Sequence, residues 1–420
     1  MDVLVLKGHI VDAPVFGELH CCENGYLICQ GGKIEGVYSA LPAQYEGASV
    51  QDYGDKLIIP SFSDMHLHGP QYAMLGMGMD LQLLEWLNTY TFPTEAKFAD
   101  SEYARMVYRK LAANLIRAGT TRVCMYASIH RKSTHILMEE LEAAGVTGYV
   151  GKVNMDRNSP NYLLESTEQS ISETILWLNE CEGRYANVHP MLTPRFTPSC
   201  TDDLMLRLGE IACERGLLVQ SHLSENLDEI AWVKALCPDC NSYWQTYARF
   251  GLFNDKTVMA HCVYSDEDER RAMLDHEVWV AHCPDSNINI ASGIAPIRRM
   301  LNEGLNVTLG SDIAGGAHLS MMDVATAAIR SSKRHWLDTG KQEKFLTVAE
   351  AFYLITSAGQ KYFNAGPGFK AGDMLHALIL DDEALLPHTF LTPEQRLERL
   401  MYLSQGNCIA ARYSQGKPVG

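Results

Sequence analysis

The sequence predicts an α/β protein whose main part is a (β/α)8 TIM barrel, joined to a small β-sandwich domain built from both chain ends. Three observations support this fold class. Eight short β-prone runs alternate with helical stretches over roughly 270 residues, which is the size of such a barrel. Nearly every run ends in polar residues, and further β-prone runs lie at both ends of the chain. A doubly wound open sheet would gather polar residues at one switch point, so the barrel is the better prediction.

The small β domain is expected to draw on both chain ends. Residues 3–6, 26–30 and 33–38 are β-prone, and Gly31-Gly32 is typical of a two-residue hairpin turn. Residues 377–380 form another apolar run, after a glycine-rich segment at 366–373. We therefore expect residues 1–57 and 366–420 to form the small domain, and residues 58–365 to form the barrel.

The barrel elements follow from the alternation of apolar runs and amphipathic stretches. The eight strands are expected to end near residues 66–68, 126–128, 152–156, 192–196, 220–225, 259–263, 281–286 and 309–312. Outer helices are expected, for example, over residues 103–118, 170–181, 204–215 and 227–235. In this arrangement every strand delivers its last residues to the same end of the barrel.

Composition excludes several classes of function. The 420 residues carry a net charge of −16, which argues against binding to nucleic-acid backbones and gives no support for binding to anionic membranes. There is no apolar run of about 18 residues, and the first residues lack the basic and apolar regions of a signal peptide. We expect a cytoplasmic protein with reduced cysteines, and we interpret Cys237 and Cys240 as a structural pair in a loop.

Four histidines and one aspartate stand at the ends of predicted strands. His66 and His68 are two residues apart, so both side chains can point to the same side of an extended strand. Apolar runs also end at His222, His261 and Asp312. Imidazole and carboxylate groups are the ligands of catalytic zinc. Any one of these residues alone is more often structural, but all five at one barrel mouth indicate a metal site.

A single metal is the better prediction. Catalytic zinc takes three or four protein ligands, so one of the five candidates should face the water instead. A two-metal site would need a further bridging ligand, such as a modified lysine near the fourth strand, and residues 189–196 contain none. Lys152 is interpreted as structural or electrostatic. His282 is left out of the ligand set, because residues 283–287 look like a turn that shapes the pocket.

Glu225 is a candidate proton carrier. It follows His222 by three residues and cannot easily reach the same ion from an extended strand. A carboxylate close to the attacking water is well placed to move protons. The alternative is that Glu225 belongs to the N-terminal region of the next helix, where the helix dipole favours acidic residues. Both interpretations stay open.

The pattern of barrel strands and candidate ligands resembles the amidohydrolase superfamily over nearly the whole chain. Within it, several stretches are similar to the guanine deaminase family. These stretches are residues 68–72, 84–95, 151–156, 194–196, 221–225 and 310–316. The Pro-Gln-Tyr segment at 70–72 and the Glu-Trp-Leu…Thr-Phe-Pro-Thr-Glu segment at 85–95 are the narrower signals, since the metal set alone specifies only the superfamily.

The resemblance implies deamination of guanine to xanthine, with one zinc ion per subunit. It implies the following roles: metal ligands His66, His68, His222 and Asp312; catalytic residues Glu225, His261 and Asp312; substrate-binding residues His68, Gln71, Arg195, Phe196, His222, Glu225 and Asp312. It also favours a homodimer. The expected binding partner is a small-molecule purine substrate. The alternatives are a deaminase of another amino-heterocycle, such as 8-oxoguanine, a pterin or a triazine, and an inactive scaffold protein.

Overall fold

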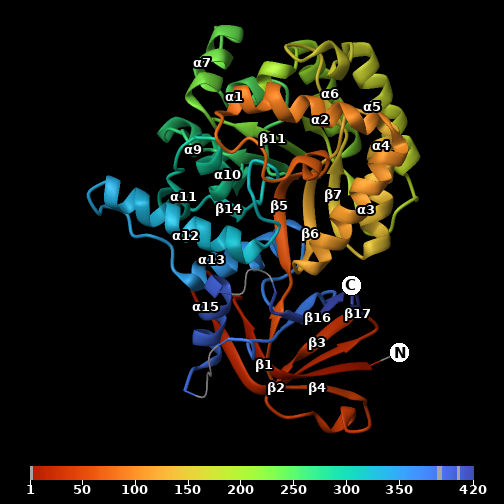
Figure 1. Cartoon of the computed structure of the whole chain (residues 1–420), viewed down its shortest axis with the longest axis vertical. Helices are drawn as coiled ribbons and strands as arrows, with labels where there is room; N and C mark the ends of the chain where they lie inside the picture. Colours follow the sequence, from red (N-terminus) through yellow and green to blue (C-terminus); the bar gives the residue numbers. More distant parts are fainter. Residues whose placement is uncertain (1–2, 386–389, 404–406) are drawn as a thin grey trace.

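The computed structural model describes residues 3–385, 390–403 and 407–420 and contains the predicted barrel with an added β domain. Figure 1 shows the barrel in the upper part of the molecule and the sheet of the small domain below it. The two ends of the described chain, Val3 and Gly420, lie in the small domain. No helix within the described ranges is long and apolar enough to cross a membrane.

Eight strand positions make up the barrel, as predicted. In chain order they are β5 (Phe62–His68), β6 (Thr120–Tyr126), β7 (Thr147–Gly151) continued by β8 (Val153–Asn154), β9 (Val188–Pro190) continued by β10 (Thr193–Pro194), β11 (Val219–Leu223), β12 (Thr257–His261), β13 (Trp279–His282) and β14 (Asn306–Leu309). All neighbouring pairs within the barrel sheets run parallel. The Asp312 amide donates to the His66 carbonyl at 2.8 Å, and a bridge joins Leu192 to Val219. These links connect the sheets, so the strand ends meet at one mouth.

Helices surround the barrel and form its rim. They are α1 (Leu83–Trp86), α2 (Phe92–Ala96), α3 (Ser101–Arg117), α4 (Arg131–Ala144), α5 (Thr167–Cys181), α6 (Asp202–Arg215), α7 (Leu227–Leu236), α8 (Gln245–Ala248), α9 (Glu267–Asp275), α10 (Pro284–Asn289), α11 (Ile297–Glu303), α12 (Met321–Asp338), α13 (Val348–Ile355) and α14 (Ser357–Tyr362). Shorter helical turns are η1 (Ala43–Tyr45), η2 (Gly69–Met74), η3 (Leu87–Thr91), η4 (Lys97–Ala99), η5 (Asn161–Leu163) and η6 (Thr197–Ser199). Local signals set the ends of α6: Thr201 caps its first turn, and Gly216 ends it at φ 64°.

The small domain is one sheet of seven strands. Their order is β17 (Lys417–Pro418), β16 (Ile409–Ser414), β15 (Ala377–Leu380), β4 (Val50–Pro60), β1 (Val3–Asp12), β2 (His20–Gln30) and β3 (Lys33–Tyr38). We expected a sandwich, and the strands instead join into a single hydrogen-bonded sheet. The sheet draws on both chain ends, as predicted, and α15 (Pro393–Leu403) packs against α12, β1 and β2. Because β4 ends at Pro60 and β5 begins at Phe62, the sheet leads directly into the first barrel strand.

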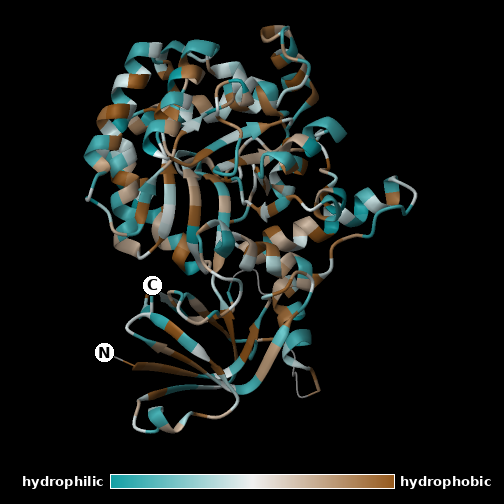
Figure 2. Cartoon of the chain, turned by 180° about the vertical axis from the view of Figure 1, so that it is seen from behind, coloured by the Kyte–Doolittle hydropathy of each residue, from teal (hydrophilic) through white to brown (hydrophobic). Residues whose placement is uncertain are grey.

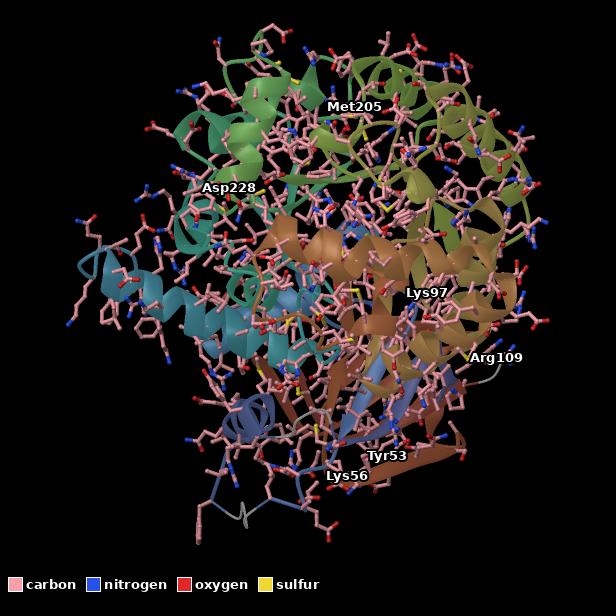
Figure 3. All side chains as sticks on the ribbon, turned by 45° about the horizontal axis from the view of Figure 1, so that its top comes forward. Tyr53, Lys56, Lys97, Arg109, Met205 and Asp228 are labelled. Atoms are coloured by element: carbon pink, nitrogen blue, oxygen red, sulfur yellow. The ribbon has the colours of Figure 1, made fainter. Side chains whose placement is uncertain are left out.

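An apolar layer fills the lower part of the barrel. Met65, Cys124, Met191, Val258 and Ala281 are buried together on or beside barrel strands. Figure 2 shows both hydrophilic and hydrophobic colours along the helices around the barrel, as expected of amphipathic helices. Figure 3 labels Tyr53 and Lys56 of β4 in the lower part of the molecule, and Met205 and Asp228 above them in the barrel. The packed layer leaves the mouth, at the C-terminal ends of the strands, as the place for a site.

Candidate active site

The predicted metal ligands converge at the barrel mouth. His66 and His68 end β5, His222 lies in β11, and Asp312 follows β14. Nε2 of His66 lies 3.3 Å from Oδ1 of Asp312, and Nε2 of His68 lies 3.5 Å from the same oxygen. Nε2 of His68 is 3.2 Å from Nε2 of His222. One nitrogen from each of the three histidines lies within 4.8 Å of the others, which is the spacing of ligands around one ion.

The chemistry of these side chains fits a zinc ion. Burial lowers the pKa of His66, His68 and His222, so the rings are neutral at pH 7 and can offer lone pairs. Nδ1 of His222 donates to the Arg195 carbonyl at 2.6 Å, and this bond leaves Nε2 free to face the cluster. Nε2 of His66 is fully buried and has no hydrogen-bond partner of good geometry within the described chain. A cation at the centre would satisfy these nitrogens.

The loop after β14 is shaped to bring Asp312 to His66. A Cβ at Gly310 would lie 2.8 Å from Cβ of His66, so only glycine fits there without displacement. Asp312 itself has φ 47°, which is uncommon outside glycine and is typical of functional sites. Burial acts to raise the pKa of Asp312, but the close approach of the His66 and His261 rings brings it down to about 2. The carboxylate is therefore ionised and suited to bind a cation.

Asp64 supports this loop and was not predicted from the sequence. Its Oδ1 accepts a hydrogen bond from the Ser311 amide at 2.9 Å, and its Oδ2 accepts one from the Ser311 hydroxyl. Burial raises the pKa of Asp64 to about 7. Asp64 therefore ties β5, which carries two histidines, to the residue that precedes Asp312.

His261 and Glu225 face each other beside the histidine cluster. Nε2 of His261 lies 3.5 Å from Oε2 of Glu225 and 3.8 Å from Oδ2 of Asp312. Nδ1 of His261 bonds to Oδ1 of Asn287 at 2.8 Å, so the Asn287 oxygen orients the ring and leaves Nε2 toward the carboxylates. His261 adopts φ 72°, another departure from ordinary backbone geometry at the site.

Glu225 is held in place as a buried acid. Oε1 accepts a hydrogen bond from the Ser292 hydroxyl at 3.0 Å, and burial raises the pKa of Glu225 to about 7. The N-cap of α7 is Asn226, and Glu229 completes its capping box while also accepting the Glu225 amide at 2.9 Å. Glu225 therefore lies just before the helix, with its side chain toward His261.

A pocket opens next to these residues. Its walls are formed by His68, Gln71, Leu83, Trp86, Leu87, Arg195, Phe196, His222, Glu225, His261, Ile290 and Asp312. The three residues expected to hold a purine, Gln71, Arg195 and Phe196, thus all reach the pocket that contains the candidate catalytic groups. Arg195 also forms a buried ion pair with Glu95, a contact that sequence reasoning did not identify.

His282 and Cys283, which are not among the predicted ligands, lie at the end of β13. Burial lowers the pKa of His282 to about 3, and neither ring nitrogen has a hydrogen-bond partner in the described part of the chain. Cys283 lies among His66, His261 and Asp312, and burial raises the pKa of its thiol well above the usual range.

Two further sequence interpretations concern local structure. The segment after His282 forms helix α10 rather than the turn that we expected, because Pro284 suits the first turn of a helix. Lys152 is buried and pairs with Glu165 at 2.7 Å. This contact agrees with the structural interpretation of the lysine.

Comparisons with known proteins identify the family of this chain. The sequence model of the amidohydrolase family matches residues 57–419. A guanine deaminase from Dictyostelium discoideum is 39% identical over 447 residues, covering 99% of this chain and 98% of the relative. A crystal structure of guanine deaminase from C. acetobutylicum, with guanine bound in the active site, superposes with a TM-score of 0.98 at 41% identity and full coverage of both chains. An adenosine deaminase from Xanthomonas campestris with bound zinc shares the fold, with a TM-score of 0.85 at 20% identity over 99% of this chain and 92% of that one. The chain belongs to the amidohydrolase family and, within it, to the guanine deaminases.

Proposed function

We propose that the protein hydrolyses guanine at C2 and releases xanthine and ammonia. One observation carries this proposal: a single pocket joins a cluster of neutral histidines, a buried acid with a pKa of about 7 and a fixed pair of polar side chains, Arg195 and Gln71. The similarity to a guanine deaminase with guanine in its active site supports the choice of substrate.

One zinc ion per subunit is part of the proposal, with His66, His68, His222 and Asp312 as ligands. The neutral rings and the ionised carboxylate support this choice. When bound, zinc acts as a Lewis acid and makes a coordinated water nucleophilic at neutral pH. His261 is proposed to form a hydrogen bond with the attacking water and not to bind the zinc ion. The reason is that its Nε2 lies between the carboxylates of Glu225 and Asp312.

Glu225 is proposed to carry protons during the reaction. A carboxyl with a pKa of about 7 is present in both protonation states near neutral pH, which suits an acid that must later act as a base. Its first task is to protonate a ring nitrogen of guanine as water attacks C2. Its second, now as the carboxylate, is to take a proton from the oxygen added at C2 and deliver it to the departing amine, which leaves as ammonia while the C2 carbonyl of xanthine forms. Asp312 is proposed to take the other proton of the attacking water, and this proton restores the Glu225 acid at the end of the cycle.

The purine is proposed to lie between polar and aromatic walls. Arg195 can donate to the carbonyl oxygen of guanine, and the Gln71 amide offers both a donor and an acceptor to the ring edge. Phe196 is buried, and Trp232 packs against its ring with centroids 6.2 Å apart. Phe196 and Trp86 supply apolar surface for the ring system.

The activity is tested by incubating the zinc-loaded protein with guanine and measuring xanthine and ammonia separately. We expect equal amounts of both products, and no reaction after chelation until zinc is restored. Product formation with a ratio other than one to one, or none at all, would contradict the proposal. Asp382→Asn, which alters a buried ion pair with Arg396 between α15 and the end of β15, is the matched control and should retain activity.

The proposal also covers the oligomeric state, the cellular location and the domain boundaries. The family resemblance favours a homodimer, which light scattering would report as twice the chain mass of 46.8 kDa. A cytoplasmic location is part of the proposal, and fractionation of cells expressing the tagged protein tests it. We also propose that residues 1–57 and 366–420 form one domain and residues 58–365 the other, which limited proteolysis tests.

A further inference from the structure

We propose that Glu95 positions both Arg195 and Gln71. Because Arg195 is then held in one orientation toward the ligand, the pocket prefers purines that carry an oxo group on the ring edge facing Arg195. The proposal rests on the proposed function, because Arg195 and Gln71 are taken to hold the purine. Glu95 does not line the pocket itself. It is therefore a positioning residue and not a catalytic one.

Glu95 contacts both side chains at once. Oε2 of Glu95 accepts a hydrogen bond from Nη1 of Arg195 at 2.6 Å, and Oε1 accepts one from Nη2 at 3.1 Å. Oε1 also accepts a hydrogen bond from Nε2 of Gln71 at 3.0 Å. Glu95 is 2% exposed and Arg195 is 3% exposed, so water does not compete for these bonds. A bidentate pair of this kind fixes both the place and the plane of the guanidinium.

The same contacts fix which way the Gln71 amide points. Its Nε2 donates to Glu95, while its Oε1 accepts from the Ala314 amide at 3.1 Å. A flipped amide would turn its oxygen to the carboxylate and its N–H groups to another N–H group. Glu95 and Ala314 therefore hold Gln71 with one N–H and one lone pair of its oxygen left for a ligand.

Arg195 keeps donors for the ligand as well. A guanidinium has five N–H groups, and the carboxylate takes two of them. The ring of Phe92 lies beneath the guanidinium, 5.1 Å from its central carbon, and supports the same orientation. Phe92 and Glu95 both belong to α2, so one short helix holds the arginine by its face and by its edge.

Charge adds to the selectivity. The buried pair is neutral overall, whereas Arg195 without Glu95 would be an uncompensated buried cation. Such a cation would shift or draw in a counter-ion, and its N–H groups would no longer meet the carbonyl oxygen of the purine in one geometry. Loss of Glu95 should therefore weaken the binding of oxo-purines more than the binding of purines without the oxo group.

Glu95→Gln tests this idea, since the amide keeps the size of the side chain but turns one acceptor into a donor. We expect KM for guanine to rise by about 10- to 100-fold, because this is the effect of losing one hydrogen bond to a charged group. The value of kcat should change by less than about 3-fold. The inhibition constant of hypoxanthine, which carries the oxo group but no amine, should rise in parallel. The inhibition constant of unsubstituted purine should stay within about 2-fold of the wild-type value.

Asp382→Asn is the matched control, because Asp382 and Arg396 form another buried bidentate pair, at 2.6 and 2.9 Å, outside the pocket. It should alter thermal stability and leave both inhibition constants unchanged. If Glu95→Gln does not fold, Glu95→Asp, which withdraws the carboxylate by one methylene, takes its place with the same selective loss expected. Equal weakening of hypoxanthine and purine, or of neither, overturns the inference. A wild-type protein that does not turn over guanine overturns the proposed function instead.

Discussion

Replacement of Glu225 by glutamine removes the proposed proton carrier without changing the size of the side chain. At its ordinary pKa of 4.5, only about one carboxyl in 300 would be protonated at pH 7, whereas a pKa of about 7 protonates about half. Burial therefore increases the acid form more than about 100-fold at neutral pH. The Ser292 bond and the 3.5 Å approach to His261 keep this acid at the mouth.

We expect Glu225→Gln to lower kcat by about 10²- to 10⁴-fold, which corresponds to about 3 to 5 kcal/mol of barrier. KM should change little, and the zinc content should match the wild-type protein because Glu225 is not a proposed ligand. If the protonated acid begins the reaction, wild-type kcat/KM should fall as pH rises through about 7. The residual rate of the variant should lack this fall.

Steady-state formation of xanthine, with metal content measured on the same samples, gives the result. Ser292→Ala is the control: it removes one hydrogen bond and keeps the acid, so we expect less than about a 10-fold loss. Activity of Glu225→Gln within 10-fold of wild type would refute the proton-carrier role. Loss of zinc from the variant would show that Glu225 acts through the metal site instead.

The remaining predictions concern the metal, the pH dependence of stability and a buried ion pair. Asp312→Asn should bind zinc at least about 10-fold more weakly in a competition titration with a chelator, and unchanged affinity would exclude Asp312 as a ligand. Burial raises the pKa of Glu269 to about 7 from 4.5, so its contribution to stability is fully present below pH 4.5 and is lost as pH rises through 7. Glu269→Gln should therefore gain stability relative to wild type between pH 5 and 8, by up to about 3 kcal/mol in urea unfolding, and a constant difference would contradict this. Lys152→Met should cost about 3 to 5 kcal/mol of unfolding free energy by leaving Glu165 unpaired, with kcat/KM nearly unchanged. A large loss of kcat/KM in a folded variant would give Lys152 a catalytic role.

The sequence was sufficient to predict what depends on local spacing. His66 and His68 share a side of β5 because they are two residues apart, and His222 is carried by a strand whose apolar run is visible in the sequence. The strand pattern also led to the barrel. The sequence pattern did not show that the fourth strand is divided into β9 and β10, which end at Pro190 and Pro194.

What the sequence could not show are contacts between distant positions. Glu95 and Arg195 are 100 residues apart, and Asp64 and Ser311 are 247 apart. No periodicity links such pairs, since only the closed barrel brings them together. The burial of the Glu95 carboxylate could not be predicted either, because it depends on the ion pair with the distant Arg195.

The most direct test of the account compares kcat/KM for guanine, 8-oxoguanine, isoxanthopterin and cytosine on the same zinc-loaded preparation. We predict that guanine is the best substrate, because Arg195 and Gln71, both held by Glu95, are proposed to bind its oxo group and ring edge, and Glu225 of the same pocket is proposed to protonate the ring. Faster turnover of any other member of the panel would contradict guanine as the substrate for which this pocket is built.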